Sequence, residues 1–351
     1  MQKCNHILQQ KKGESMLNRV GERTIKFTKT PKLISGYAIV GPKEGLSPVS
    51  KYFDYILKND LFNEKTYEIA ERKMLEQAIC GATDKANILS TDIDVLLSGD
   101  LLNQIISASY SARQIQTAFV GVFGACSTMT ESIALGACLV DGGYCGRVAC
   151  ATCSHFSTAE RQFRSPLELG CQRPPTSQWT VTGAGCSILA NEGNGHNIVY
   201  ATFGKVVDFG INDMNNMGAA MAPAAADTLR ALFRDTNTTP SDYDLIATGD
   251  LGKLGSEILV DLMENYGYKM GENYCDCGQL IYSNKQRSFM GGSGCGCSAS
   301  VINSYILSKL DSGDYKKVIL MSTGALMSTT SSQQGETIPG IAHAVVIEKG
   351  R

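Results

Sequence analysis

The sequence predicts an α/β protein made of two similar halves, and two observations carry this prediction. The first is an internal repeat, because DIDVLLSGDLL at 92–102 is matched by DYDLIATGDLG at 242–252, an offset of 150 residues. The second is length, since 351 residues exceed the size at which a single hydrophobic core usually keeps growing. We expect the halves at residues 31–205 and 206–351, after a polar, Lys-rich and mobile tail at residues 1–30.

Both halves contain the same elements in the same order. Apolar residues at helical spacing predict a helix within 68–88 and another within 222–242, and each of these stretches ends in a polar linker. Each helix precedes a short buried strand with a Gly-Asp turn, then a glycine-rich bend, a central helix, and a strand at 147–151 or 317–321. Each half closes on a strand entered through glycine, VTGAGCSILANEG or IPGIAHAVVIEKG. This order predicts mainly parallel strands inside and helices outside, with the two glycine-rich bends meeting at a pocket between the halves.

Composition excludes several classes of protein. The chain is 43% apolar with a formal net charge of −2, so it has no general electrostatic footprint for nucleic acid. Its 13 cysteines are an odd number scattered through apolar runs, which favours a reducing compartment over a disulfide framework. No apolar run reaches the roughly 18 to 20 residues that span a bilayer, and the N-terminus lacks a signal-peptide pattern. We expect a protein that is at most peripheral to a membrane.

Cys126 is the candidate nucleophile of the first glycine-rich bend. A cysteine at a helix N-terminus lies near unpaired N–H groups that favour the thiolate, although a small buried core residue is an equally good interpretation. A base would have to come from four histidines. His6 lies in the tail, His196 in a polar turn where we expect it to be solvated, and His343 in the last strand as a core residue. His155, which follows a buried strand, is the base that an acyltransferase or thioesterase would pair with Cys126.

The duplicated halves and the FGACST bend resemble the thiolase and ketoacyl synthase III superfamily. This resemblance implies a five-layered α-β-α-β-α fold, a cysteine used for acyl transfer, and a homodimer. The sequence departs from the superfamily at two places, because Gly249-Asp250-Leu251 stands where a synthase has its histidine and Gly292-Ser293 stands where it has Gly-Asn. A carboxylate beside a thiol disfavours the thiolate. We therefore predict a protein that is not an enzyme and in which Cys126 is a vestigial nucleophile.

A closer resemblance runs from about residue 33 to 349. The motifs LLSGDLLNQ, FGACST, LVDGG, TAERQFR, MGAAMAPAAADT, GGSGCGCSA and QQGETIPGIAH are similar to those of the stage V sporulation protein AD family of endospore-forming bacteria. The resemblance implies non-enzymatic binding of dipicolinic acid (pyridine-2,6-dicarboxylate) and its movement, with calcium, during spore formation and germination. It also implies a peripheral position on the inner membrane of the forespore or spore, beside other stage V sporulation A channel proteins. We expect no resident cofactor, with calcium carried by dipicolinate itself.

Dipicolinate is flat and doubly anionic, so its site needs N–H groups, hydroxyls or an arginine against an apolar or glycine surface. Arg161 and Arg164 are spaced to lie side by side on a helix, where either one could bind a carboxylate or remain on a solvated face. Asp100 and Asp250 occupy equivalent places in the repeat, and each either caps a turn or faces the pocket in a protonated or calcium-linked form. We expect no metal site made by the protein alone, and neither zinc nor redox chemistry at the CDC, CGC and CATC pairs. The predicted ligand-binding residues are Asp100, Asn103, Cys126, Ser127, Thr128, His155, Arg161, Arg164, Asp250, Gly292, Ser293 and Cys295.

Overall fold

The computed structural model describes residues 18–163 and 173–350 of the chain. Its main sheet consists of two parts with the same order of strands, which we call the first arm and the second arm. The first arm consists of β3 (Lys32–Val40), β5 (Val95–Gly99), β6 (Phe119–Gly121), β7 (Arg147–Ser154) and β9 (Gly183–Ala190). The second arm consists of β10 (His196–Thr202), β11 (Leu245–Thr248), β12 (Tyr274–Asp276), β14 (Lys317–Ala325) and β15 (Gly340–Glu348).

The order of strands is the same in both arms. It is β6-β5-β7-β9-β3 in the first and β12-β11-β14-β15-β10 in the second, and the arms are joined where β3 pairs with β10. The outer three strands of each arm are parallel, and the fourth, β9 or β15, is antiparallel to its neighbours. The two strands found from the internal repeat are β5 and β11, which are equivalent in this order.

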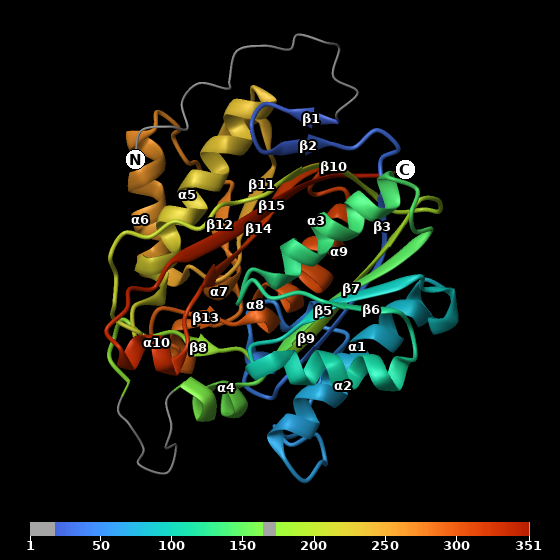
Figure 1. The fold of residues 1–351 in the computed structure, drawn as a ribbon, viewed down its shortest axis with the longest axis horizontal. Coiled ribbons are helices and arrows are strands. Elements are labelled where there is room, and N and C mark those ends of the chain that lie inside the picture. The colour runs from blue at the N-terminus through green and yellow to red at the C-terminus, as the bar shows by residue number, and fades with distance from the viewer. Residues whose placement is uncertain (1–17, 164–172, 351) are drawn as a thin grey trace, which may run out of the picture.

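Helices complete five layers around the two arms (Figure 1). One outer layer, α1 (Tyr67–Lys85) and α2 (Ile106–Ile115), covers the first arm, and the other, α5 (Met217–Thr236) and α6 (Gly252–Asn265), covers the second. Between the arms lie α3 (Thr128–Asp141) and α8 (Cys295–Val301), which continues through a π-helical turn (Ile302–Ile306) into α9 (Leu307–Ser312). The predicted α-β-α-β-α fold is therefore confirmed. The remaining short elements are β1 (Arg19–Val20), β2 (Thr24–Lys26), β4 (Tyr55–Ile56), α4 (Phe156–Phe163), β8 (Trp179–Thr180), α7 (Cys277–Leu280), β13 (Gly292–Ser293) and α10 (Thr329–Gln333).

Small residues let the middle helices approach the strands closely enough to bring the two glycine-rich bends together. A Cβ atom on Gly185 of β9 would lie 2.3 Å from the carbonyl oxygen of Ala299 in α8, and one on Gly136 of α3 would lie 2.9 Å from the Cys150 sulfur. Any larger side chain at Gly185 would push α8 away from the first arm, because real Cβ atoms do not approach a backbone atom so closely. The position of α8 in turn sets the position of the bend that precedes it.

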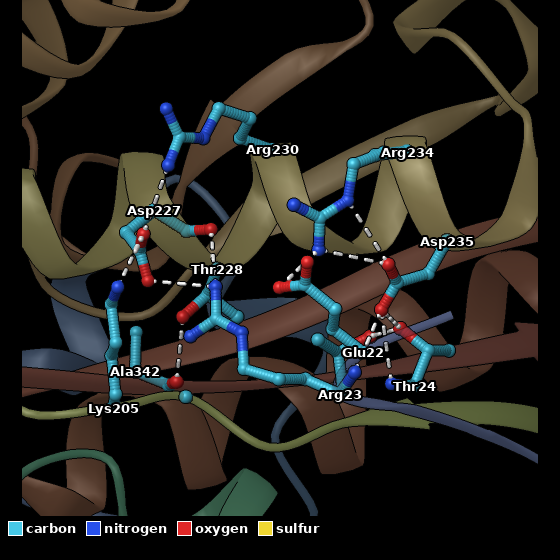
Figure 2. A network of polar contacts seen from close by, with 12 residues as sticks. Glu22, Arg23, Thr24, Lys205, Asp227, Thr228, Arg230, Arg234, Asp235 and Ala342 are labelled. Atoms are coloured by element: carbon cyan, nitrogen blue, oxygen red, sulfur yellow. Dashed lines mark hydrogen bonds and ion pairs between the residues drawn. The ribbon is translucent and has the colours of Figure 1, made fainter. Parts of the chain in front are cut away.

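Residues 18–30 form a hairpin that docks on β10 and α5, so the prediction of a mobile tail as far as residue 30 is wrong for these residues. Strand β2 pairs with β10, and the carboxylate of Asp235 in α5 accepts hydrogen bonds from the backbone N–H groups of Arg23 and Thr24. The Arg23 guanidinium lies 2.7 Å from the Asp227 carboxylate, and Figure 2 shows Arg23 of the hairpin beside Asp227, which belongs to α5. Residues 1–17 lie outside the described part of the chain, and the boundary at 205/206 stays a prediction.

Candidate functional site

Cys126 lies on a tight bend between β6 and α3 that its neighbours hold by local hydrogen bonds. Ala125 adopts a left-handed φ of 49°, which costs a non-glycine residue energy. The Ser127 hydroxyl donates to the Gly124 carbonyl at 2.7 Å, and the Thr128 hydroxyl donates to the Ala125 carbonyl at 2.6 Å. Both hydroxyls are buried, and their hydrogen bonds stabilise the bend. The expectation that Ser127 and Thr128 donate to a ligand does not agree with this geometry.

The second glycine-rich bend meets the first, as the sequence predicts. Gly294, at a φ of 99°, starts α8, and its N–H lies 3.3 Å from Oδ2 of Asp250. The Cys295 thiol donates to the Ala125 carbonyl at 3.1 Å. This hydrogen bond connects the two halves, and through it Cys295 stabilises the backbone of the first bend. The N–H of Gly294, which could have donated to a ligand carboxylate, already donates to a carboxylate of the protein.

Asp250 is the group that sets the chemistry of Cys126. Its buried carboxyl accepts a hydrogen bond from the Thr323 hydroxyl at 2.7 Å and another from the Cys126 thiol. Burial raises the pKa of Asp250 to about 7. Burial also raises the pKa of the Cys126 thiol well above its ordinary value, and the negative charge of Asp250 raises it further. The thiol therefore stays protonated at neutral pH, which is the opposite of what nucleophilic catalysis requires.

The three histidines of the described residues are bound elsewhere. His155 lies 2.8 Å from the Asp60 carbonyl through Nε2 and does not line the pocket beside Cys126. His343 is buried in β15, where burial lowers its pKa to about 4. His196, expected to be solvated, is instead buried at the start of β10 and lies 2.9 Å from the Asp311 carboxylate. The alternative pairing of Cys126 with His155 is therefore not formed.

A pocket opens in front of Cys126 and is lined by both halves. Its inner part has a volume of about 50 Å³ and adjoins an outer groove of about 390 Å³, with which it shares four lining residues, Leu101, Phe123, Phe163 and Met327. The two volumes together reach the size of typical small-molecule sites. The other residues that line the inner part are Ala125, Cys126, Ala159, Glu160, Gln178, Thr180, Met214, Asn215, Met217, Ser293 and Ala325.

Three of the predicted ligand-binding residues line this pocket, Cys126 and Ser293 in the inner part and Asn103 in the outer groove. Asp100 does not, because its carboxylate accepts from the N–H groups of Leu102 and Ala108, both at 2.8 Å, and so caps the turn before α2. This is the turn-capping alternative left open above.

Two further predicted residues do not present a side chain to the pocket. Arg161 is half exposed and lies 2.6 Å from the Glu68 carboxylate, away from the lining residues, because α4 turns it outward. Gly292 contributes its backbone, since its carbonyl accepts from Gln178 at 3.1 Å. Arg164 lies outside the described residues. Of the two alternatives for Arg161, a ligand-binding side chain or one on a solvated helix face, the structure therefore agrees with the second.

Glu160 and Gln178 are among the polar residues of the inner pocket that sequence reasoning missed. Glu160 is buried in α4 and forms an ion pair with Arg173. The Gln178 side chain donates through Nε2 to the carbonyls of Asp250 and Gly292, while its Oε1 has no hydrogen-bond partner among the described residues. Neither residue lies in the repeated part of the sequence, so only the tertiary structure brings them to Cys126.

The chain matches one protein family over nearly its whole length. The family model described as Stage V sporulation protein AD matches residues 21–348. The Stage V sporulation protein AD of Bacillus subtilis (strain 168) is 47% identical over 329 residues, which cover 94% of this chain and 97% of that protein.

Several solved structures share the fold at low sequence identity. Cerulenin-bound OleA of Xanthomonas campestris aligns with a TM-score of 0.62 and 12% identity, covering 92% of this chain and 98% of that one. The 3-oxoacyl-[acyl-carrier-protein] synthase III of Aquifex aeolicus aligns with a TM-score of 0.57 and 12% identity, covering 91% and 99%. Human mitochondrial 3-ketoacyl-CoA thiolase in complex with CoA aligns with a TM-score of 0.56 and 12% identity, covering 92% and 98%. At this identity the likeness concerns the fold alone.

Proposed function

Because the chain belongs to the stage V sporulation protein AD family, we propose that it is a sporulation protein that binds dipicolinic acid without turnover in the pocket in front of Cys126. The ligand enters as its calcium chelate, which the protein takes up into the developing spore and releases in germination. The observation that carries the proposal is the Cys126–Asp250 pair. Cys126 lines a cavity between the halves, and its pairing with Asp250 keeps the thiol protonated and unreactive.

The side chains around the cavity support a flat ligand of low net charge. Its walls are largely apolar, with Phe123, Phe163 and Met217 among them. Within the described part of the chain, Glu160 is the charged side chain that lines the inner pocket, and it is already paired with Arg173. A bare dianion beside a buried carboxylate is repelled, whereas calcium cancels the two charges of dipicolinate. The chelate therefore suits this pocket better than the free dianion does.

Calorimetric titration of the full chain with dipicolinate in the presence of calcium tests the proposal. We expect saturable binding that Cys126→Trp abolishes, because an indole at this position fills the inner pocket. Absence of binding by the native chain would refute the proposed function. Incubation with an acyl-CoA followed by mass analysis tests the competing activity, since an acyltransferase traps the acyl group on Cys126 and a binding protein leaves the mass unchanged.

We further propose that the protein works as a homodimer at the inner membrane of the spore, in contact with other stage V sporulation A channel proteins. Strand β6 ends the first arm, and Val120 on it is 50% exposed, so this edge can accept a strand from a second copy. In the described residues, no helix has both the length and the apolar character needed to cross a membrane.

A further inference from the structure

Residues 283–290, between α7 and β13, form a surface loop that presents two cations and an aromatic ring to solvent. Burial alternates along the second half of this loop, and its exposed residues are Lys285, Arg287 and Phe289. Arg287 and Phe289 both have a left-handed φ, of 52° and 55°, which is unfavourable for side chains of this size. Phe289 nevertheless leaves 48% of its surface in water. Backbone strain of this kind persists only where the surrounding structure imposes it, and it gathers at functional sites.

Hydrogen bonds to neighbouring segments hold the loop in this conformation. The Gln286 side chain donates through Nε2 to the Lys43 carbonyl at 2.6 Å. The backbone N–H of Met290 donates to the Ser177 carbonyl at 3.1 Å. Both sides of the loop tip are therefore anchored, and Phe289 is held outward by the fold.

The neighbouring turn at Glu44–Leu46 extends the same surface, because the hydrogen bond from Gln286 brings the loop to the start of this turn. Leu46 is 73% exposed. A Cβ atom on Gly45 would lie 2.4 Å from Cγ2 of Ile56, so the turn packs against β4. Ile56 is itself 40% exposed. Apolar side chains of three segments that are distant in the sequence thus protrude from adjoining parts of the surface.

Residues 43–56 and 283–290, which we call the docking face, carry positive charge among these apolar side chains. Their exposed charged residues are Lys51, Lys285 and Arg287. The carboxylates of these two stretches are withdrawn from the surface, since Glu44 is buried and Asp54 is partly buried and lies 2.6 Å from the Lys85 ammonium. Protruding apolar side chains among cations are typical of proteins that bind an anionic membrane surface, because the lipid phosphates attract the cations while the apolar groups enter the boundary of the acyl chains.

We infer that the docking face binds the surface of an anionic lipid bilayer, with Leu46 and Phe289 in the interfacial region and the three cations against lipid phosphates. The inference rests on the membrane location in the proposed function and assigns that location to particular residues. The loop leads directly into β13, whose Ser293 lines the pocket. One stretch of chain therefore contributes both to the docking face and to a wall of the pocket.

Flotation of the full chain with lipid vesicles measures this binding. Vesicles of phosphatidylcholine with about 30% phosphatidylglycerol are compared with vesicles of phosphatidylcholine alone. We expect binding to the anionic vesicles and not to the neutral ones. Binding should fall at least tenfold when the salt concentration is raised from about 0.1 M to about 1 M, because exposed charges are then screened within roughly 3 Å.

Two substitutions test the assigned residues. Phe289→Asn removes the ring and should weaken vesicle binding by about tenfold or more. Arg287→Asn removes one cation and should weaken it about fivefold. Asparagine adopts a left-handed φ more readily than phenylalanine or arginine, so both variants should be at least as stable as the native chain, and thermal unfolding checks this.

Tyr144→Asn and Lys316→Asn are the matched controls. They remove an exposed ring and an exposed cation shortly before the first residues of β7 and β14, at the end of the sheet away from the pocket, and both should bind vesicles as the native chain does. Equal binding to the two kinds of vesicle, or native binding by both folded asparagine variants of the loop, overturns the inference. Absence of binding to either kind also overturns it and would leave the docking face to a protein partner. Titration of the same variants with dipicolinate and calcium should match the native chain, which separates a failure of this inference from a failure of the proposed ligand binding.

Discussion

Replacing Asp250 by asparagine is expected to make Cys126 reactive. Burial is the largest cause of the raised pKa of this thiol, and the charge of Asp250 is the next. Two unit charges about 4 Å apart interact by roughly 4 kcal/mol at an effective dielectric constant of 20. This energy corresponds to a change of about 3 in the pKa of the thiol, since one pKa unit is about 1.4 kcal/mol. Asparagine removes the charge and preserves the size of the side chain, so the thiolate population should rise.

Alkylation by iodoacetamide, followed by mass analysis of the peptide that contains Cys126, measures the thiolate population. The comparison is made at pH 8, because the pKa of Asp250 is about 7 and its carboxyl is then mostly ionised in the native chain. We expect alkylation of Cys126 to be at least tenfold faster in the variant, since burial still keeps the pKa raised. Cys80 is exposed and serves as a reference thiol in the same molecules.

Asp276→Asn is the control for this experiment. Asp276 is also buried, and burial raises its pKa to about 6, but it is not among the groups that shift the pKa of Cys126. The reasoning is refuted if Asp250→Asn alkylates at the native rate. It is also refuted if the two asparagine variants accelerate the reaction equally, because a general loosening of the core would then be the cause.

Three further predictions follow from other buried or edge residues. Burial raises the pKa of Glu44 from 4.5 to about 7, so the folded state holds this proton more tightly than the unfolded state does. The stability of the fold therefore falls as the pH rises between these two values. Glu44→Gln should raise the free energy of unfolding in urea by up to about 3 kcal/mol at pH 8 and should hardly change it at pH 4. Arg23→Ala should lower the free energy of unfolding by about 2 kcal/mol, because Asp227 then stays nearly buried with weaker partners. An unchanged free energy of unfolding would show that the N-terminal hairpin contributes no stability. Val120→Lys at the β6 edge should convert a dimer into a monomer in light scattering, whereas an unchanged mass would place the dimer contact elsewhere.

The fold could be predicted in detail because it is encoded twice. The strand 95–99 and the strand 245–248 have the same local pattern, and each is followed by the same succession of bend, helix and strand. A pattern that recurs at a fixed offset is far more informative than either copy alone. The N-terminal hairpin has no second copy, and its strands of two and three residues are too short to show periodicity. For this reason the sequence does not predict the hairpin at residues 18–30.

The site could be predicted only as far as the backbone determines it. The meeting of the two bends follows from the repeat, whereas the presence of Asp250 beside Cys126 follows from the resemblance to the ketoacyl synthase III superfamily. The direction of each side chain does not follow. The sequence therefore predicts Arg161 among the ligand-binding residues, whereas α4 turns it toward Glu68. Hydroxyl groups next to a bend are equally ambiguous, since Ser127 can serve the backbone or a ligand, and the local hydrogen bond prevails here.

The presence of Asp250 beside Cys126, where the resemblance to ketoacyl synthases implies a histidine, changes which ligand charge the pocket tolerates. An imidazole can carry a positive charge beside a thiolate, so the pair as a whole stays neutral while the sulfur is reactive. A carboxyl with a pKa of about 7 can only add negative charge as the pH rises, and the thiol responds by keeping its proton. Above pH 7 the pocket therefore becomes more negative without becoming more nucleophilic. Such a cavity should bind a calcium chelate increasingly in preference to the free dianion from pH 6 to pH 8, and a preference that falls over this range would mean that Asp250 does not act on the ligand.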